Sequence, residues 1–157
     1  LLTILLTGSE INGDWSWKYI ITTQTDNQPI DTNFQFSDKA TKMLSGYYKR
    51  DDTLVTQNIW LYLGSDTDLR QKIIEKFISR SDIDKNNLIN IPIISIGEYS
   101  KNFCATSNDK ISCTVYWWHD NLFSEINVDL PVNIPSEEVG DLVNLIVTAA
   151  DKKMSGY

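Results

Sequence analysis

The sequence has few basic residues, one histidine and no glycine-rich loop, and each shortage removes a class of function. Its 157 residues include 14 lysines and arginines against 21 aspartates and glutamates, which gives a net charge of −7. No run of basic residues is longer than two. Nucleic-acid binding needs a concentrated basic surface, so no nucleic-acid partner is predicted. A nucleotide cofactor is not predicted either, because phosphate-binding loops are rich in glycine.

Metal ligands and catalytic pairs are equally scarce. His119 is the only histidine, and neither a His-x-x-x-His nor a Cys-x-x-Cys spacing occurs, so no metal site is predicted. A histidine-based hydrolase would have to use His119, oriented by the adjacent Asp120, with Ser112 or Ser124 as the nucleophile. Neither serine has the flanking glycines of a nucleophile elbow. A small hydrolase is therefore kept as a weaker alternative to a binding protein.

Residues 82–93 resemble the first half of an EF-hand calcium loop without completing it. Asp82 and Asp84 alternate as oxygen ligands would. The sixth position is Asn87, where the sharp turn favours glycine, and the twelfth is Ile93, where a bidentate glutamate is needed. The segment is interpreted as a solvated loop, and no cofactor is predicted.

The residues that are present suit one folded domain of ordinary size. A chain of 157 residues can bury most of the surface that its unfolded form exposes. Hydrophobic residues make up 41% and charged residues 22%, proportions typical of globular proteins rather than of disordered or multi-span membrane chains. We predict a leader remnant at residues 1–9 and a single α+β domain at residues 10–157.

The first six residues, Leu-Leu-Thr-Ile-Leu-Leu, form an apolar run that is typical of the end of a signal peptide. Residues 5–8 resemble the segment before the lipid-bearing cysteine of bacterial lipoproteins, but Ser9 stands where that cysteine belongs. Either Ser9 replaces a natural cysteine, or residues 7–9 are an ordinary cleavage site, or the run is a first β-strand. Export to the bacterial periplasm, the cell surface or the medium is predicted, with membrane contact only through a lost lipid anchor.

Two strands and a short helix are predicted in the first 63 residues. Alternation of apolar side chains predicts a strand at residues 15–25. Ser37 can cap a short helix that runs to residue 44, with Gly46 as its terminator. Residues 53–63 are apolar on both faces, which is typical of a central strand.

Two longer amphipathic helices are predicted later in the chain. One begins at Ser65 and the other at Ser136, where each serine can accept a hydrogen bond from the first turn. Each helix carries one apolar stripe. The stripes consist of Leu69, Ile73, Ile74, Phe77 and Ile78, and of Val139, Leu142, Val143, Ile146, Ala149 and Ala150. The second helix should lie across the sheet.

A disulfide-closed hairpin is predicted at residues 103–114. Asn108 and Asp109 both tolerate the positive φ of a type I′ turn. A two-residue turn at that place puts Cys104 directly opposite Cys113, at a non-hydrogen-bonded position where Cα atoms approach to about 4.5 Å. A disulfide between them agrees with the predicted export, because such bonds persist in oxidising compartments.

The hairpin extends into a three-stranded meander. Residues 115–118 continue the second strand, residues 119–121 form a turn, and residues 123–130 return. Together with the earlier strands and the helices, the expected architecture is α+β, an antiparallel sheet covered by helices. The order of elements is similar to that of Mog1/PsbP-like sandwiches, a resemblance that implies an architecture and no particular activity.

The aromatic residues at the end of the meander are the candidate binding site. Tyr116, Trp117, Trp118, His119 and Asp120 follow one another, and neighbouring strand residues point to opposite faces, so one tryptophan is available for contact unless helices cover both faces. We predict an exported, non-enzymatic module that binds a protein partner. Its acidic charge suits a basic partner, such as the toxin or enzyme that an immunity-type inhibitor neutralises. A carbohydrate- or cell-wall-binding module is the alternative.

Overall fold

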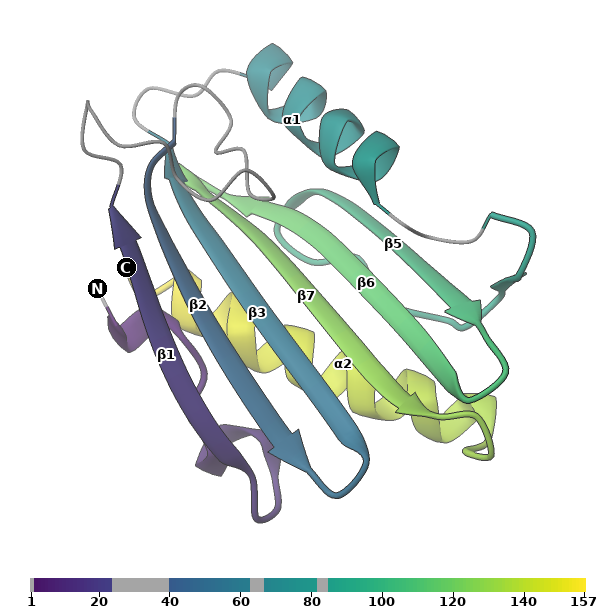
Figure 1. Cartoon of the computed structure of the whole chain (residues 1–157). Helices are drawn as coiled ribbons and strands as arrows, with labels where there is room; N and C mark the ends of the chain where they lie inside the picture. Colours follow the sequence, from purple (N-terminus) through teal and green to yellow (C-terminus); the bar gives the residue numbers. More distant parts are fainter. Residues whose placement is uncertain (1, 24–39, 63–66, 82–84) are drawn as a thin grey trace.

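A seven-stranded antiparallel sheet forms the middle layer of the computed structural model (Figure 1). The structure describes residues 2–23, 40–62, 67–81 and 85–157. Within them the strand order is β1-β2-β3-β7-β6-β5-β4. The strands are β1 (Ser16–Thr23), β2 (Ala40–Arg50), β3 (Thr53–Tyr62), β4 (Leu88–Ile89), β5 (Glu98–Thr106), β6 (Lys110–His119) and β7 (Leu122–Pro131).

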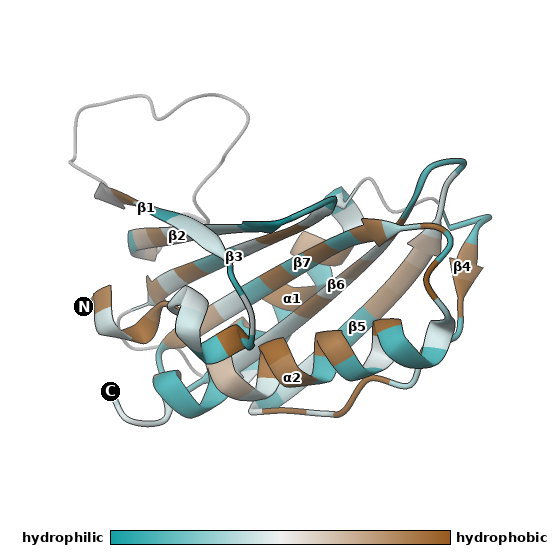
Figure 2. Ribbon diagram, turned by 90° about the horizontal axis from the view of Figure 1, so that it is seen from below, coloured by the Kyte–Doolittle hydropathy of each residue, from teal (hydrophilic) through white to brown (hydrophobic). Residues whose placement is uncertain are grey.

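Helices lie on both sides of this sheet (Figures 1 and 2). Helix α1 (Thr67–Arg80) covers part of one side, which we call the outer face. Helix α2 (Ser136–Met154) crosses the other side, the inner face, beside two short 3-10 helices, η1 (Leu2–Ile4) and η2 (Gly8–Ile11). The predicted α+β class with an antiparallel sheet is thus confirmed, whereas the Mog1/PsbP-like assignment stays a prediction. No described helix is long and apolar enough to cross a membrane.

Both predicted apolar stripes pack against the sheet. The α2 stripe lies in the larger core, between the inner face and the helix, and the α1 stripe lies in a smaller aromatic core on the outer face. The first residues of α2 differ from the prediction, because Pro135 occupies the N-cap position and no side chain caps the helix. Residues 63–66, which include the predicted start of the other helix at Ser65, lie outside the described residues.

The predicted short helix ending at Gly46 is wrong over its described part. Residues 40–44 belong to β2, which pairs with β1 on one side and with β3 on the other. Gly46 lies inside this strand, where an added Cβ would come within 2.3 Å of the Tyr48 hydroxyl. The absence of a side chain at Gly46 therefore leaves space for the Tyr48 hydroxyl, and Gly46 does not terminate a helix. Ser37 lies outside the described residues.

The amino-terminal segment is neither a strand nor separate from the domain in this structure. Its three buried side chains are Ile4, Leu5 and Leu6. The Leu6 amide donates to Gln57 Oε1 at 3.0 Å, and the Leu6 carbonyl accepts from the Tyr48 hydroxyl at 2.9 Å. Lys153 Nζ on α2 donates to the Leu5 carbonyl at 2.8 Å. The leader remnant remains a prediction, but the packed unit begins well before residue 10.

The hairpin register is as predicted. Cys104 pairs with Cys113 and forms a disulfide, with Cα atoms 4.1 Å apart. The turn type is not as predicted, because neither Asn108 nor Asp109 has a positive φ. The Ser107 hydroxyl lies 3.0 Å from Asp109 Oδ1, and the Ser107 amide donates to the Lys110 carbonyl at 2.8 Å. These contacts close the turn without the left-handed backbone of a type I′ loop.

Loss of this disulfide should destabilise the domain measurably. The bond closes a loop of about ten residues, so the chain-entropy model gives a loss of about 2 to 3 kcal/mol in the free energy of unfolding when both cysteines become alanine. Urea denaturation of the double variant beside the oxidised wild type measures the difference. The unreduced protein should also be two hydrogens lighter than the reduced form. Recovery of two free thiols after export would contradict the bond.

Candidate functional site

The predicted aromatic site is core, not surface. The side chains of Tyr116, Trp117 and Trp118 are each at most 2% exposed. Trp117 points into the core beneath α2, whereas Tyr116 and Trp118 point into the core beneath α1. Neighbouring residues do face opposite sides of the sheet, as expected, but a helix covers each side. The proposed contact patch of these three aromatic side chains is therefore wrong.

The other two predicted site residues lie at the end of the same strand. His119 is half-buried, and its Nδ1 is 3.5 Å from Asp151 Oδ1 on α2. Asp120 is an exposed turn residue with a φ of 49°. Ser112 donates to Asp129 on the outer face, and Ser124 Oγ is buried without a hydrogen-bond partner among the described residues. Among the described residues, neither serine is hydrogen-bonded to His119, and the hydrolase alternative stays a prediction.

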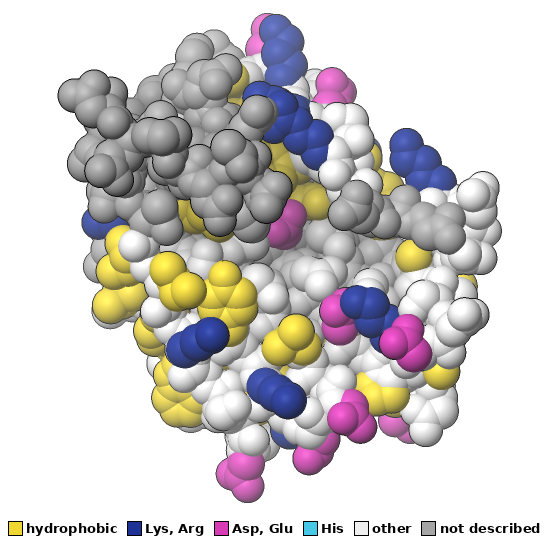
Figure 3. Space-filling view, in the orientation of Figure 1, with side chains coloured by type: hydrophobic (Ala, Val, Ile, Leu, Met, Phe, Trp, Pro, Cys, Tyr) yellow, Lys and Arg dark blue, Asp and Glu magenta, His cyan; other side chains and the backbone are white. Residues whose placement is uncertain are grey.

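Much of the outer face carries no described helix. Helix α1 packs over one end of it, where Phe77 contacts Trp60 and Phe123 at ring-centroid distances of 4.8 Å. The opposite ends of β1, β2 and β3 are free of described elements (Figures 1 and 3). This face is the part of the described surface where polar side chains from several strands line up.

A row of hydrogen-bonded polar side chains crosses the middle of the outer face. It consists of Ser45 on β2, Asn58 on β3, Glu125 on β7 and Tyr116 on β6, which are paired in that order by the strand register. The Ser45 hydroxyl donates to Asn58 Oδ1 at 2.8 Å, and Asn58 Nδ2 donates to Glu125 Oε1 at 2.9 Å. The Tyr116 hydroxyl also bonds the Glu125 carboxylate. We call this row the polar ladder.

A second set of polar contacts lies one step along the strands. The Thr114 hydroxyl donates to Asn127 Oδ1 at 2.9 Å, and Asn127 Nδ2 donates to Asp129 Oδ1 at 3.2 Å. Lys110 Nζ is 2.9 Å from Asp129 Oδ2. Burial alone would raise the pKa of Asp129, but the bonds from Ser112 and Lys110 outweigh it and hold the pKa below its ordinary value. The hydrogen bonds and the ion pair hold these side chains in place.

Glu125 is the chemically unusual member of the polar ladder. Its burial raises the pKa of the carboxyl, and the hydrogen bonds from Asn58 and Tyr116 only partly oppose that rise. Burial raises the pKa of Tyr116 as well. The centre of the outer face therefore favours a neutral carboxyl, which can both donate and accept hydrogen bonds.

Glu125→Gln should make the protein more stable at neutral pH. Because the pKa of Glu125 is raised by folding, its contribution to stability is fully present below the pKa of an unfolded glutamate and is lost as pH rises through the folded pKa. The neutral glutamine removes that loss. Thermal melts from pH 4 to pH 8 should give equal Tm values for the two proteins in acid and a higher Tm for the variant at pH 8. A variant that melts lower at every pH would contradict the assignment.

Lysines and apolar side chains surround the polar rows. Lys18 Nζ lies 5.3 Å from the centre of the Tyr47 ring, and Ile20 and Leu54 are 48% and 43% exposed. Figure 3 shows dark-blue basic side chains, lysine or arginine, among yellow hydrophobic ones over β1–β3. Lys49 on β2 and Lys101 on β5 face the same side by register. We call Lys18, Lys49 and Lys101 the rim lysines.

The outer face is more basic than the whole chain. Two of the three acids on its described strands are held by cations, Glu98 by Arg70 and Asp129 by Lys110, and the third is the half-buried Glu125. The rim lysines form no ion pair with a described residue, although Lys49 shares an open depression with Asp14 and Asp51. Exposed acids gather instead at the start of α2. They are Glu137, Glu138 and Asp141.

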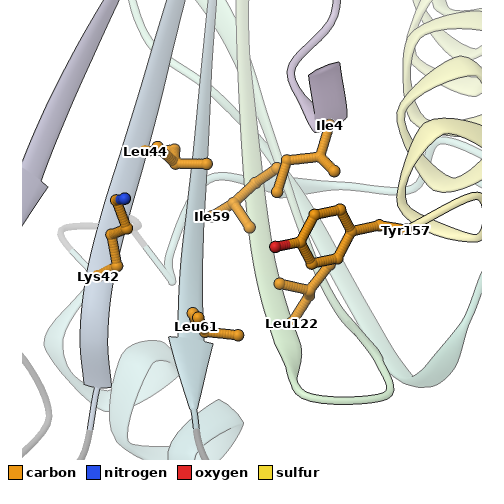
Figure 4. A pocket seen from close by; sticks show the side chains of 7 residues that line it. All are labelled: Ile4, Lys42, Leu44, Ile59, Leu61, Leu122 and Tyr157. Carbon is orange, nitrogen blue, oxygen red and sulfur yellow. The ribbon is translucent and has the colours of Figure 1, made fainter. Parts of the chain in front are cut away.

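A small apolar pocket lies on the inner side, between β2, β3, β7 and the two chain ends (Figure 4). The cavity volume is about 10 Å³, room for about one water molecule, and the ring of Tyr157 covers it. Ligand pockets usually enclose about 300 to 1,000 Å³ and carry several polar groups. This pocket is smaller, and apart from Lys42 and the Tyr157 hydroxyl its lining is apolar. It is therefore a packing gap and not the candidate site. Among the described residues, no group of three metal-ligating side chains occurs.

Part of the outer face could be predicted from the sequence of β7. In β7, the polar residues Glu125, Asn127 and Asp129 alternate with apolar ones, which indicates a strand with one polar side. The partners of these residues on β3 and β2 could not be predicted, because the register between distant strands is not local. Asn58 and Ser45 were missed for that reason.

The fold and the polar rows define a class of protein, an α+β domain whose single antiparallel sheet keeps part of one face uncovered by described elements. No family model matches the sequence, and no curated protein matches it. The extracellular domain of PknH from Mycobacterium tuberculosis is similar in structure, with 10% identity, 100% of this chain and 95% of that chain covered, and a TM-score of 0.61. A putative uncharacterized protein from Mycobacterium smegmatis has 11% identity, 91% and 92% coverage, and a TM-score of 0.45. The first likeness shows that the two chains share a fold.

Proposed function

We propose that this chain is an exported, non-enzymatic binding domain whose contact surface is the uncovered part of the outer face. The observation that carries the proposal is a set of exposed and half-buried side chains on a braced sheet. They are Lys18, Ile20, Tyr47, Lys49, Leu54, Thr56 and Asn127. The buried members of the polar rows, Ser45, Asn58, Thr114 and Tyr116, do not offer their groups to a ligand, but their hydrogen bonds join four strands and hold the sheet in place. A surface fixed in this way loses little conformational freedom on binding, which favours affinity.

The disulfide and the likeness to an extracellular domain both support the proposed export. The disulfide between Cys104 and Cys113 suits an oxidising compartment, such as the periplasm or the cell exterior. The PknH domain with the same fold is an extracellular domain. We therefore place this chain outside the cytoplasm, in the periplasm, at the cell surface or in the medium.

A basic protein partner is the second candidate. The net charge of −7 and the exposed acids at the start of α2 favour such a partner, because complementary charge speeds encounter. An immunity-type inhibitor of a basic toxin or enzyme would use this helix end. It would not use the outer face, whose rim lysines would repel a basic protein.

A bulky substitution on either the outer face or α2 can distinguish the two candidate surfaces without changing the charge of the protein. Thr56 is half-exposed in the middle of the outer face, and Thr148 is exposed on α2. Binding of the purified chain to immobilised bacterial cell-envelope fragments should be lost in Thr56→Tyr and retained in Thr148→Tyr, with equal Tm values. Failure of the wild type to bind, or loss of binding only in Thr148→Tyr, would overturn the assignment of the outer face.

A further inference from the structure

We infer that the outer face binds an acidic polysaccharide, one whose sugar units carry carboxylates. This inference rests on the proposed function, since it names the ligand class of the same surface. Three observations support it: the sign of the charge on that face, the chemistry of the polar rows, and the length of the surface.

The sign of the charge selects an anionic ligand. The rim lysines project from β1, β2 and β5. Of the acids on the described strands of this face, Glu98 and Asp129 are paired with cations and Glu125 is half-buried. Lys18 lies at one side of the face and Lys101 at the other, so a ligand that crosses the sheet meets positive charge at both ends. Exposed charges of this kind act over about 10 Å at moderate ionic strength.

The groups between the rim lysines suit hydroxyl-rich ligands. Thr56 and Asn127 lie side by side on β3 and β7, and both are half-buried. They carry a hydroxyl and an amide group, which donate and accept hydrogen bonds as sugar hydroxyls do. Thr114 on β6 is buried beside them and holds Asn127 through a hydrogen bond. Tyr47 on β2 and Phe103 on β5 flank this row, and both are half-buried. Aromatic faces next to hydrogen-bonding groups can contact the apolar faces of sugar rings while the polar groups bind their hydroxyls.

The dimensions suit a polymer and not a small molecule. The face runs across six strands, from β1 to β5, so its two ends are five strand spacings apart, which at about 4.8 Å per spacing is a span of about 24 Å. A small ligand would need a concave pocket instead.

The test compares polymers that differ in one property at a time. The probes are polygalacturonate, which has carboxylates on sugars, dextran, which has sugars without charge, and poly-L-glutamate, which has carboxylates without sugars. Calorimetric titration of the full chain should show binding to polygalacturonate that is at least tenfold tighter than to either control polymer. Raising NaCl to 0.5 M should weaken it.

Charge-reversal variants locate the contact. Lys18→Glu with Lys101→Glu should weaken binding of polygalacturonate at least tenfold. The matched control is Lys85→Glu with Lys152→Glu, which changes the net charge equally at two exposed positions that lie in none of the strands and should leave binding within twofold. Thermal melts check that both pairs fold.

Each other outcome overturns the inference in a different way. Equal binding of dextran would identify a neutral glycan, and equal binding of poly-L-glutamate would identify an acidic protein. If no polymer binds while Thr56→Tyr still abolishes binding to envelope fragments, the ligand class is wrong and the proposed function stands. If the control pair loses binding as much as the Lys18 and Lys101 pair, the outer face is not the contact.

Discussion

Trp118→Ala is expected to lower the free energy of unfolding by about 3 to 5 kcal/mol, the range for removal of a fully buried tryptophan. Its indole fills the core beneath α1, with ring centroids 5.1 Å from those of Tyr62 and Phe123. Trp118 Nε1 donates to the Arg70 carbonyl at 3.1 Å, so the substitution also removes a partly buried hydrogen bond that joins α1 to the sheet.

Urea denaturation of the variant measures this loss. Leu145→Ala is the control, because Leu145 is partly exposed on α2 and its truncation should change stability by no more than about 0.5 kcal/mol. If the Trp118→Ala protein is as stable as the control, Trp118 is not a core residue, and the aromatic contact patch is again a candidate binding site.

Removal of residues 1–8 should have a still larger effect. The segment places three fully buried side chains on the inner face, and each large-to-small change at such a site costs about 2 to 5 kcal/mol. The deletion also leaves Gln57 Oε1 without the Leu6 amide and Lys153 without the Leu5 carbonyl. The summed loss is comparable with the whole stability of a domain, about 5 to 15 kcal/mol.

A chain that begins at Ser9 should therefore lack a cooperative thermal transition. The milder variant Leu5→Ala should fold but lose about 2 to 5 kcal/mol in urea denaturation. If the shortened chain melts at the wild-type temperature, the segment is dispensable for folding and the interpretation of residues 1–9 as a cleaved leader gains support.

Local patterns predicted the elements that depend on local contacts. The disulfide register follows from counting outward from a two-residue turn, and the stripes of α1 and α2 follow from helical periodicity. The type of that turn was wrong because the Ser107 side chain offers an alternative closure. Propensity alone could not reveal that bond.

Non-local packing explains the other errors. Ser37 and Gly46 favour a helix only through local preferences. The two flanking strands supply backbone hydrogen-bond partners along β2, and this pairing outweighs those preferences. The burial of Trp117 and Trp118 depends on helices that are far away in sequence. The candidate site was missed for the same reason, since Ser45, Asn58 and Glu125 meet only through the strand order.

The net charge does not tell where on the molecule the charges lie. Three exposed acids lie at the start of α2, whereas Lys18 and Lys101 lie on the outer face. The binding preference of a surface depends on the charges that it exposes, and the average over the chain hides them.

The most direct test of the central claim is a titration of the ¹⁵N-labelled chain with tetragalacturonate, followed by amide chemical shifts. We predict that the largest shifts fall on outer-face positions of β2, β3 and β7, among them Tyr47, Thr56 and Asn127, while amides of α2 move little. Saturable shifts confined to the start of α2, or no shifts at millimolar ligand, would contradict the assignment of the outer face as the binding surface for this ligand.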